Sequence, residues 1–332
     1  MLNPHSKLNP KLFNPDVEQV PIRKGFGEGL VKAGEVDANV VALCADLTES
    51  TQMHLFKEKF PERFVEIGVA EQNLVTVASG MAAMGKIPFV SSYAMFSPGR
   101  NWEQIRTTIA YNDRPVKIVG SHAGVSVGPD GGTHQAIEDM AIMRVMPNMM
   151  VISPCDAIEA RKATLALAKL AKPAYLRLAR EKTPVMTTEE TPFEIGKGQT
   201  VYIPDTGLAQ VGIIATGALV YKAIIAAKEL EKEEGIKVAV VNISTIKPID
   251  AELIEAIARE TRAIVTVEEH QIAGGLGSAV AEVLVQKYPV PIEFVGVKDK
   301  FGQSGTPEEL IEYYGMGVKS IKAAVEKALR RK

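Results

Sequence analysis

The stretch Gly68-Val69-Ala70-Glu71-Gln72-Asn73-Leu74 places a carboxylate, Glu71, at the start of a predicted helix. Apolar and small residues make up almost all of the segment that follows, from Leu74 to Met84. A helix that is apolar nearly all round is expected to be buried. A carboxylate beside it must be paired, neutralised or used in chemistry, because burial penalises its charge. A lone glutamate would most often only complement the helix dipole, but a cluster of histidine and aspartate follows this one.

Length and composition exclude several classes of protein. The chain has 332 residues, enough for two domains of ordinary size, and a net charge of −2. We therefore expect no nucleic-acid partner and no membrane-surface partner. No apolar run reaches the ~20 residues of a membrane span, and Met1 to Lys7 lack the apolar core of a signal peptide. Cys44 and Cys155 stand in unrelated contexts, without disulfide or metal-ligand spacing, which favours a cytoplasmic location.

The order of elements predicts an α/β fold with two doubly wound domains. After residue 20, short β-branched runs alternate with helical segments, which is typical of parallel βαβ units. The alternation stops in the polar, proline-flanked segment 183–192 and then resumes. We place an N-terminal arm at 1–20, on the surface or on a partner, a first domain at 21–186, a linker at 187–200 and a second domain at 201–332.

Individual elements are predicted from local patterns. Buried strands are expected at 39–44, 88–92, 116–120, 149–153, 211–215, 238–241, 263–267 and 292–295. A helix is expected from Trp102 to Tyr111. Capping boxes are expected to start helices at Asp156 and Thr306, and Asp250 is expected to cap another.

The densest polar cluster is the segment Ser121-His122-Ala123-Gly124-Val125-Ser126-Val127-Gly128-Pro129-Asp130-Gly131-Gly132-Thr133-His134-Gln135. It follows a predicted strand, and open α/β sheets bind ligands just beyond the carboxyl ends of their strands. Its glycines and proline allow unusual backbone angles and close approach of a ligand. A surface loop with incidental polar residues is the alternative, but ordering so long a loop without a purpose is costly.

Three weaker signals leave alternatives open. Gly274-Gly275-Leu276-Gly277 lacks the full dinucleotide-binding spacing and is better interpreted as a tight strand-to-helix connection. Arg177 and Arg180 lie at a strand end, where one of them could bind an anion bidentately, or both could be solvated. Tyr93 and Phe96 belong either to the core or to a stacking wall for a flat ring.

Taken together, these residues resemble the C-terminal portion of a transketolase, a thiamine diphosphate enzyme, from about Val20 to the end of the chain. The resemblance implies a pyrimidine-binding domain followed by a transketolase C-terminal-like domain. It implies that Glu71 shares a proton with a ring nitrogen of the cofactor's aminopyrimidine. Asp46, Tyr93 and Phe96 are implied to be cofactor-binding as well. A third family aromatic has no counterpart, because Ser97-Pro98-Gly99 occupies that stretch.

The resemblance also implies a site for a sugar phosphate. Asp130 is implied to select the stereochemistry of a sugar hydroxyl, and His134 to lie near the reacting end of the donor. The imidazoles of His122 and His134 are implied to be catalytic, as donors where oxyanions form. The residues implied to hold the distal phosphate are Arg23, Ser50, His122 and Arg180.

The family's metal motif, Gly-Asp-Gly followed by an asparagine, does not occur in this sequence. We therefore expect a split enzyme, in which an N-terminal partner subunit holds the diphosphate and Mg²⁺ or Ca²⁺, and this chain contributes no metal ligand. The expected assembly contains two copies of each chain, with the apolar helix after Glu71 in an interface. The expected reaction is transfer of a two-carbon ketol unit from a ketose phosphate to an aldose phosphate.

Three other functions are alternatives to this one. A deoxyxylulose-phosphate synthase shares Glu71 and the stretch from Asp130 to His134, but that family tends to have an arginine in place of His122. The beta subunit of a 2-oxo acid dehydrogenase is also a separate chain, but it does not show Asp130-Gly131-Gly132-Thr133-His134-Gln135 so fully. A non-catalytic binding subunit need not retain so many costly polar groups.

Overall fold

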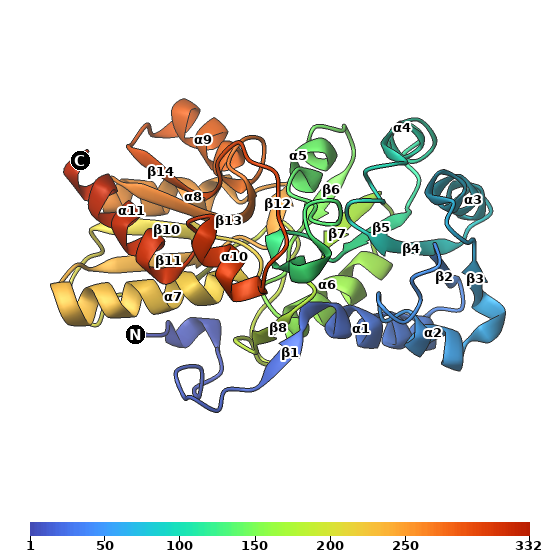
Figure 1. Ribbon diagram of the computed structural model, residues 1–332, viewed down its shortest axis with the longest axis horizontal. Coiled ribbons are helices and arrows are strands. Elements are labelled where there is room, and N and C mark those ends of the chain that lie inside the picture. The colour runs from blue at the N-terminus through green and yellow to red at the C-terminus, as the bar shows by residue number, and fades with distance from the viewer.

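Two twisted sheets, each covered by helices on both faces, lie side by side in the computed structural model of residues 1–332 (Figure 1). The first sheet has seven strands in the order β12-β6-β7-β5-β4-β2-β3, and all but β12 are parallel. Its strands are β2 (Val40–Cys44), β3 (Phe64–Glu66), β4 (Ile87–Tyr93), β5 (Lys117–Ser121), β6 (Met150–Ile152), β7 (Ala174–Arg177) and β12 (Thr245–Lys247).

The helices of this first domain form a layer on either side of the sheet (Figure 1). One layer contains α1 (Ile22–Val36), α2 (His54–Lys59) and α6 (Ala157–Ala168). The other contains α3 (Glu71–Ala83), α4 (Trp102–Gln104), its continuation as a π-helical turn (Ile105–Ala110), and α5 (Asp139–Arg144). Short 3₁₀ turns occur at Pro4–Ser6, Pro61–Arg63 and Val125–Asp130.

The second domain repeats the layered design on a five-stranded sheet with the order β14-β13-β10-β11-β9. Its strands are β9 (Gln199–Tyr202), β10 (Val211–Ala215), β11 (Val238–Asn242), β13 (Ile264–Gln271) and β14 (Ile292–Val297). Its helices are α7 (Leu219–Glu229, continued as a π-helical turn, Leu230–Glu234), α8 (Ala251–Thr261), α9 (Leu276–Lys287), α10 (Pro307–Tyr313) and α11 (Val318–Arg330). None of the helices has both the length and the apolar character of a membrane span.

The predicted α/β fold and all eight predicted strands are confirmed. The continuous apolar runs of β2 and β10 are buried at every residue, as expected of strands covered on both faces. Strands β5 and β11 are also buried throughout, although β5 begins with Lys117 and β11 ends with Asn242. Gly274 has a φ of +84° in the tight connection between β13 and α9, which confirms that interpretation. The pattern did not predict the hairpin of β1 (Gln19–Pro21) with β8 (Lys182–Pro184), whose strands are short.

One of the two predicted capping boxes is present. At Thr306, the hydroxyl accepts from Glu309 N–H and the Glu309 carboxylate accepts from Thr306 N–H, so that prediction is confirmed. At Asp156 the prediction was wrong, although the side chain does cap α6 by accepting from Glu159 N–H. The Glu159 carboxylate accepts instead from Cys155 N–H and from the Asn242 amide, because it is drawn into the buried contact with the second domain.

The N-terminal arm packs on the second domain of its own chain. Asn3 N–H donates to the Val201 carbonyl, and the Leu12 side chain is fully buried in the core of the second domain. Figure 1 shows this segment running beneath α7 and β11. The arm therefore completes an apolar core that the second domain alone would leave open.

Helix α3 is buried along one side only, in contrast to the prediction. Glu71, Leu74, Val75, Ala78 and Ala82 are buried, whereas Met84, just after the helix, is 84% exposed. A Cβ added at Gly80 would meet nothing within 4 Å. The helix lies in the outer layer of the domain, so only its inner side packs against protein. Its outer side presents the polar Gln72 and Asn73 near the start of the helix and the small residues Gly80 and Ala83 towards its end.

We expect Asp156→Ala to lower the free energy of unfolding by roughly 3 kcal/mol, because it leaves buried N–H groups without an acceptor. Asp156 is fully buried and accepts from Glu159 N–H, Met186 N–H, Thr187 N–H and the Thr187 hydroxyl. Thermal and urea unfolding measure the loss. Asp250→Ala is the matched control: it removes another helix cap with bonds only to Leu253 N–H and Gly198 N–H. Equal losses in the two variants would contradict the prediction.

Candidate functional site

The candidate site lies at the carboxyl edge of the first sheet. Strands β4 and β5 are parallel and end side by side, with Tyr93 opposite Ser121. The chain leaves β4 towards Phe96 and Arg100, and it leaves β5 directly into His122 and the polar loop. Adjacent parallel strands thus bring two segments together at the edge where such sheets bind ligands.

Glu71 begins α3 at this edge. Its side chain is 5% exposed, and its Oε1 forms an ion pair of 2.8 Å with Nη1 of Arg100. Asn101 Nδ2 donates to the backbone carbonyl of Glu71 at 2.9 Å, which fixes the start of the helix. The other carboxylate oxygen has no donor from the protein. Glu71 lines a hollow together with Val69, Ala70, Gln72, Asn73 and Arg100.

Arg100 is a site residue that sequence reasoning missed. Besides its ion pair with Glu71, its guanidinium carbon lies 4.1 Å from the centre of the Phe96 ring. The one signal in the sequence is its position directly after Ser97-Pro98-Gly99, where the third aromatic was expected. Arg100 packs over Phe96 next to that stretch and so contributes to the wall of the pocket.

The aromatic residues form a half-buried row rather than part of the core. The Tyr93 and Phe96 rings are stacked with centroids 6.0 Å apart, and the Tyr93 ring stacks on the His122 imidazole at 3.9 Å. His134 meets the Phe96 ring edge-on at 5.3 Å. The row therefore connects the neighbourhood of Glu71 with the two predicted histidines.

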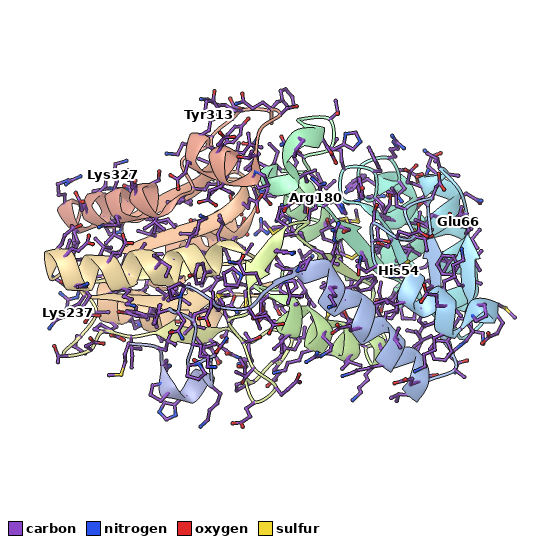
Figure 2. The ribbon with its side chains drawn as sticks, turned by 60° about the horizontal axis from the view of Figure 1, so that its bottom comes forward. His54, Glu66, Arg180, Lys237, Tyr313 and Lys327 are labelled. Carbon is purple, nitrogen blue, oxygen red and sulfur yellow. The ribbon has the colours of Figure 1, made fainter.

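A cationic cluster lies beyond this row. Arg23 Nη1 donates to His122 Nε2 at 2.8 Å and to the Ser50 carbonyl at 3.2 Å. The Arg23 Nε is buried without a partner, and burial together with the nearby charge of Arg180 lowers the pKa of Arg23. Arg180 donates to the Val127 carbonyl and lies near the middle of the molecule (Figure 2). Two neighbouring guanidinium groups with an unused buried donor are suited to an anion.

His122 is a neutral acceptor in this cationic cluster. A guanidinium group can only donate, so His122 Nε2 accepts from Arg23 and the proton lies on Nδ1, which is 2.9 Å from the Ser121 hydroxyl. Burial, followed by the charges of Arg23 and Arg180, lowers the pKa of His122 to about 3. Neither ring nitrogen therefore offers a free N–H to an oxyanion, which differs from the expected donor role. The nearby donors are the arginines.

The other predicted site residues, Asp130, Ser50 and Asp46, make fewer side-chain contacts with the site. Asp130 is exposed on the polar loop, and its carboxylate makes no hydrogen bond. Ser50 contributes its carbonyl rather than its hydroxyl. Asp46 has a φ of +57° and is held by its N–H, which donates to Glu66 Oε1 at 2.7 Å. No hydrogen bond joins Asp46 to Glu71, Tyr93 or Phe96.

Glu66 was also missed by sequence reasoning, and it organises the turns next to Glu71. Its carboxylate accepts from Asp46 N–H, from the Thr48 hydroxyl and from Gly68 N–H.

No group of three or more His, Cys, Asp or Glu side chains in the chain is arranged to hold a metal ion.

Comparisons with known proteins place the chain in a family. Residues 18–186 match the pyrimidine-binding domain of transketolase, and residues 205–321 match the transketolase C-terminal domain. The chain belongs to the transketolase family. A chain of Methanocaldococcus jannaschii, provisionally named a transketolase C-terminal section, is 44% identical over 93% of this chain and 96% of its own length.

Two further transketolase relatives extend this comparison. The 6-deoxy-6-sulfo-D-fructose transketolase subunit of a Clostridium species is 38% identical over 96% of this chain and 98% of its own length. A solved structure described as a split-gene transketolase in an inactive β4 tetramer is similar with a TM-score of 0.87. It is 45% identical and covers 94% of this chain and 99% of its own.

We expect the imidazole of His122 to show no protonation by NMR between pH 8 and pH 5, because its folded-state pKa is about 3. The unfolded imidazole titrates at ~6.5, so acid favours the unfolded chain. Between that pH and the folded-state pKa, the contribution of His122 to the free energy of unfolding falls by about 1.4 kcal/mol for each pH unit of acidification. His122→Asn should flatten the acid slope of unfolding by that amount. The urea-unfolded chain is the reference, and a His122 signal that titrates near pH 6 in the folded protein would refute the assignment.

Proposed function

We propose that this chain is the C-terminal subunit of a split transketolase and works in the cytoplasm with an N-terminal, diphosphate-binding partner subunit. The complex transfers a two-carbon ketol unit from a ketose phosphate to an aldose phosphate, as in the pentose phosphate pathway. One observation carries the proposal: an unbroken row of contacts joins an acidic end of the site to a cationic end. That row consists of Glu71, Arg100, Phe96, Tyr93, His122 and Arg23.

The acidic end fits the pyrimidine half of thiamine diphosphate. When bound, this cofactor supplies a carbon nucleophile and accepts the electrons of the broken carbon–carbon bond. Glu71 has a carboxylate oxygen without a protein donor at a buried position, which suits it to hold a proton at a ring nitrogen. Tyr93 and Phe96 offer aromatic surface for a flat ring.

The cationic end fits the distal anion of a sugar substrate. Arg23 and Arg180 hold the phosphate, and Ser50 keeps Arg23 in place through its carbonyl. His122 supports Arg23 as an acceptor, His134 lies against Phe96 near the reacting end, and Asp130 meets a sugar hydroxyl. The Clostridium relative is named for a sulfonated ketose. A sulfonate, like a phosphate, is negatively charged.

The outer side of α3 supports the proposal of a partner subunit. Val69 is 69% exposed and Met84 is 84% exposed, and Tyr111 of the neighbouring turn is also open. Val69 stands just before α3, next to Glu71, whereas Met84 follows the C-terminal end of the helix, so exposed apolar side chains occur at both ends of α3. We infer two copies of each chain in the complex, with the diphosphate and Mg²⁺ or Ca²⁺ held by oxygen ligands of the partner. Relatives of nearly the same length, named as a subunit or a section, favour this division.

We expect Glu71→Gln to reduce turnover of the reconstituted complex roughly 10²- to 10⁴-fold, because an amide cannot exchange a proton with the ring. Steady-state rates with a ketose phosphate donor and an aldose phosphate acceptor measure the loss. Glu103→Gln is the matched control, since Glu103 is an acid in the first turn of the adjacent α4. Undiminished turnover of the Glu71 variant would remove the proposed cofactor role.

We also expect the purified chain alone to show no ketol transfer, because it offers residues only for the pyrimidine and sugar ends of the site. Adding the diphosphate-binding subunit with thiamine diphosphate and Mg²⁺ should restore the reaction. Native mass spectrometry of the active sample tests the stoichiometry of two copies of each chain. Full activity of a preparation that contains only this polypeptide would contradict the split arrangement.

A further inference from the structure

The polar loop Ser121–Gln135, here called the donor loop, carries His122, Asp130 and His134. It belongs to the first domain, but much of what holds it comes from the second. Helix α10 and the segment before it pack against its 3₁₀ turn, as Figure 1 also shows. Two polar contacts, one near each end of the loop, fix it to the second domain.

The first contact is made by Glu269 of β13. Its Oε1 accepts the N–H of Ser126 at 2.6 Å, and the Ser126 side chain also interacts with this carboxylate. The residue is 4% exposed, and burial raises the pKa of its carboxyl. Gly124 lies against the carboxylate with a φ of +90°, and a Cβ there would meet Oε1 at 2.2 Å. Glu269 thus occupies space that the loop leaves open for it.

The second contact is made by the segment 302–304, which precedes α10. Gln135 Nε2 donates to the Gln303 carbonyl at 3.0 Å and to the Val125 carbonyl of its own loop at 3.0 Å. Gly132 and Gly302 pack so closely that a Cβ at Gly132 would meet the Gly302 carbonyl at 2.6 Å. Asp130, whose carboxylate makes no hydrogen bond, lies between Ser126 and Gln135 in the sequence.

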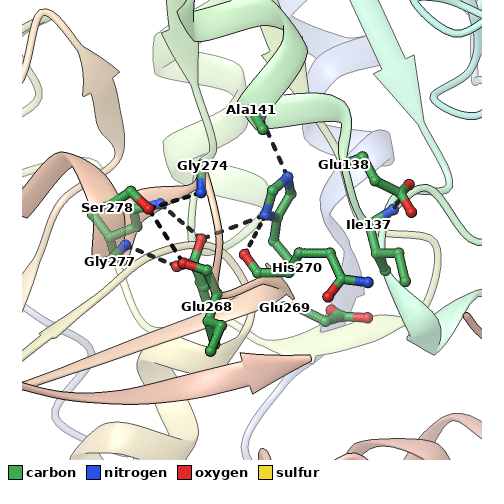
Figure 3. Close-up of polar contacts among 12 residues, drawn as sticks. Ile137, Glu138, Ala141, Glu268, Glu269, His270, Gly274, Gly277 and Ser278 are labelled. Carbon is green, nitrogen blue, oxygen red and sulfur yellow. Dashed lines mark hydrogen bonds and ion pairs between the residues drawn. The ribbon is translucent and has the colours of Figure 1, made fainter. Parts of the chain in front are cut away.

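Glu269 differs from its neighbour Glu268, although both are buried carboxylates. Glu268 accepts from Leu276 N–H at 2.7 Å and Gly277 N–H at 2.8 Å, and so caps α9 within the second domain. Figure 3 shows the Glu269 carboxylate lying apart from that of Glu268. Only Glu269 reaches the donor loop.

We propose that Glu269 is a positioning residue for sugar recognition: the second domain sets the place of Asp130 through the bond from Ser126 to Glu269. This inference rests on the proposed function, in which Asp130 recognises a sugar hydroxyl. A buried N–H that loses its acceptor destabilises the local arrangement, so the loop moves when the carboxylate is removed. The second domain then acts on donor choice without touching the sugar.

The test measures the ratio of kcat/KM for D-xylulose 5-phosphate and its C3 epimer, D-ribulose 5-phosphate, in the reconstituted complex. Glu269→Ala should lower this ratio about tenfold, because the buried N–H of Ser126 then has no acceptor. Glu269→Gln keeps an acceptor oxygen and should retain most of the ratio. Glu268→Ala is the control for a purely structural loss: it should lower stability and leave the ratio unchanged. Gly124→Ala displaces the carboxylate from the loop side and should reproduce the effect of Glu269→Ala.

A double-mutant cycle with Asp130→Ala shows whether Glu269 acts through Asp130. In the Asp130→Ala background, Glu269→Ala should change the ratio less than twofold. Equal losses for both epimers, or an undiminished effect in that background, would overturn the proposal.

Hydrogen exchange of the donor loop separates failure of this inference from failure of the proposed function. Glu269→Ala should exchange faster over residues 122–130, and Glu269→Gln should not. If Asp130→Ala leaves the ratio unchanged, the sugar role proposed for Asp130 is wrong, while faster exchange in Glu269→Ala still supports positioning of the loop. Unchanged exchange in Glu269→Ala overturns the inference.

Discussion

A fully buried ion pair between Arg177 and Asp139 holds the carboxyl edge of the first sheet in place. Arg177 Nε donates to Asp139 at 2.8 Å, and its Nη2 donates to the backbone carbonyls of Ala136 and Glu269. The Tyr175 hydroxyl donates to the same carboxylate oxygen at 2.7 Å. Removing two charges from water is costly, and here both donors meet one oxygen of Asp139, while its other oxygen is buried without a partner. Here the guanidinium joins the end of the donor loop, the first sheet and the second domain in one cluster.

This cluster explains why the two arginines at the end of β7 have different roles. Arg177 forms its ion pair in the interior, whereas Arg180, three residues later, is partly exposed and donates to the donor loop. The positive charge of Arg180 next to Arg23 is unfavourable on its own, because like charges repel and both groups lose hydration. The Glu181 carboxylate lies 3.6 Å from Arg180 Nε, and its charge opposes the effect of Arg180 on Arg23, so a neighbouring acid offsets part of this repulsion.

The sequence predicted the parts of the molecule that depend on local pattern. Strands such as β2 and β10 are continuous apolar runs, and Glu71, His122 and His134 stand in recognisable motifs. The missed residues depend on contacts between distant segments: Arg100 meets Glu71 across 29 residues, and Glu269 meets Ser126 across 143. Strand β12 was missed for the same reason, since its three residues leave the second domain to pair with β6 of the first. The apolar composition of α3 fits a helix buried within one chain and a helix buried in an assembly equally well. The composition alone therefore does not show that the outer side of α3 is exposed in this chain.

The two ends of the candidate site differ in how far this chain alone completes them. At the cationic end, Arg23, His122 and the Ser50 carbonyl already hold one another, and the donor loop is fixed from both domains. At the acidic end, the buried carboxylate of Glu71 has a single charged partner, Arg100, which is itself half exposed. A carboxylate pairs more strongly when water is excluded, because the local dielectric falls. Covering the outer side of α3 would exclude that water, so an interface on this helix and the chemistry of Glu71 are physically coupled. The sugar end, by contrast, needs no such cover to keep its shape.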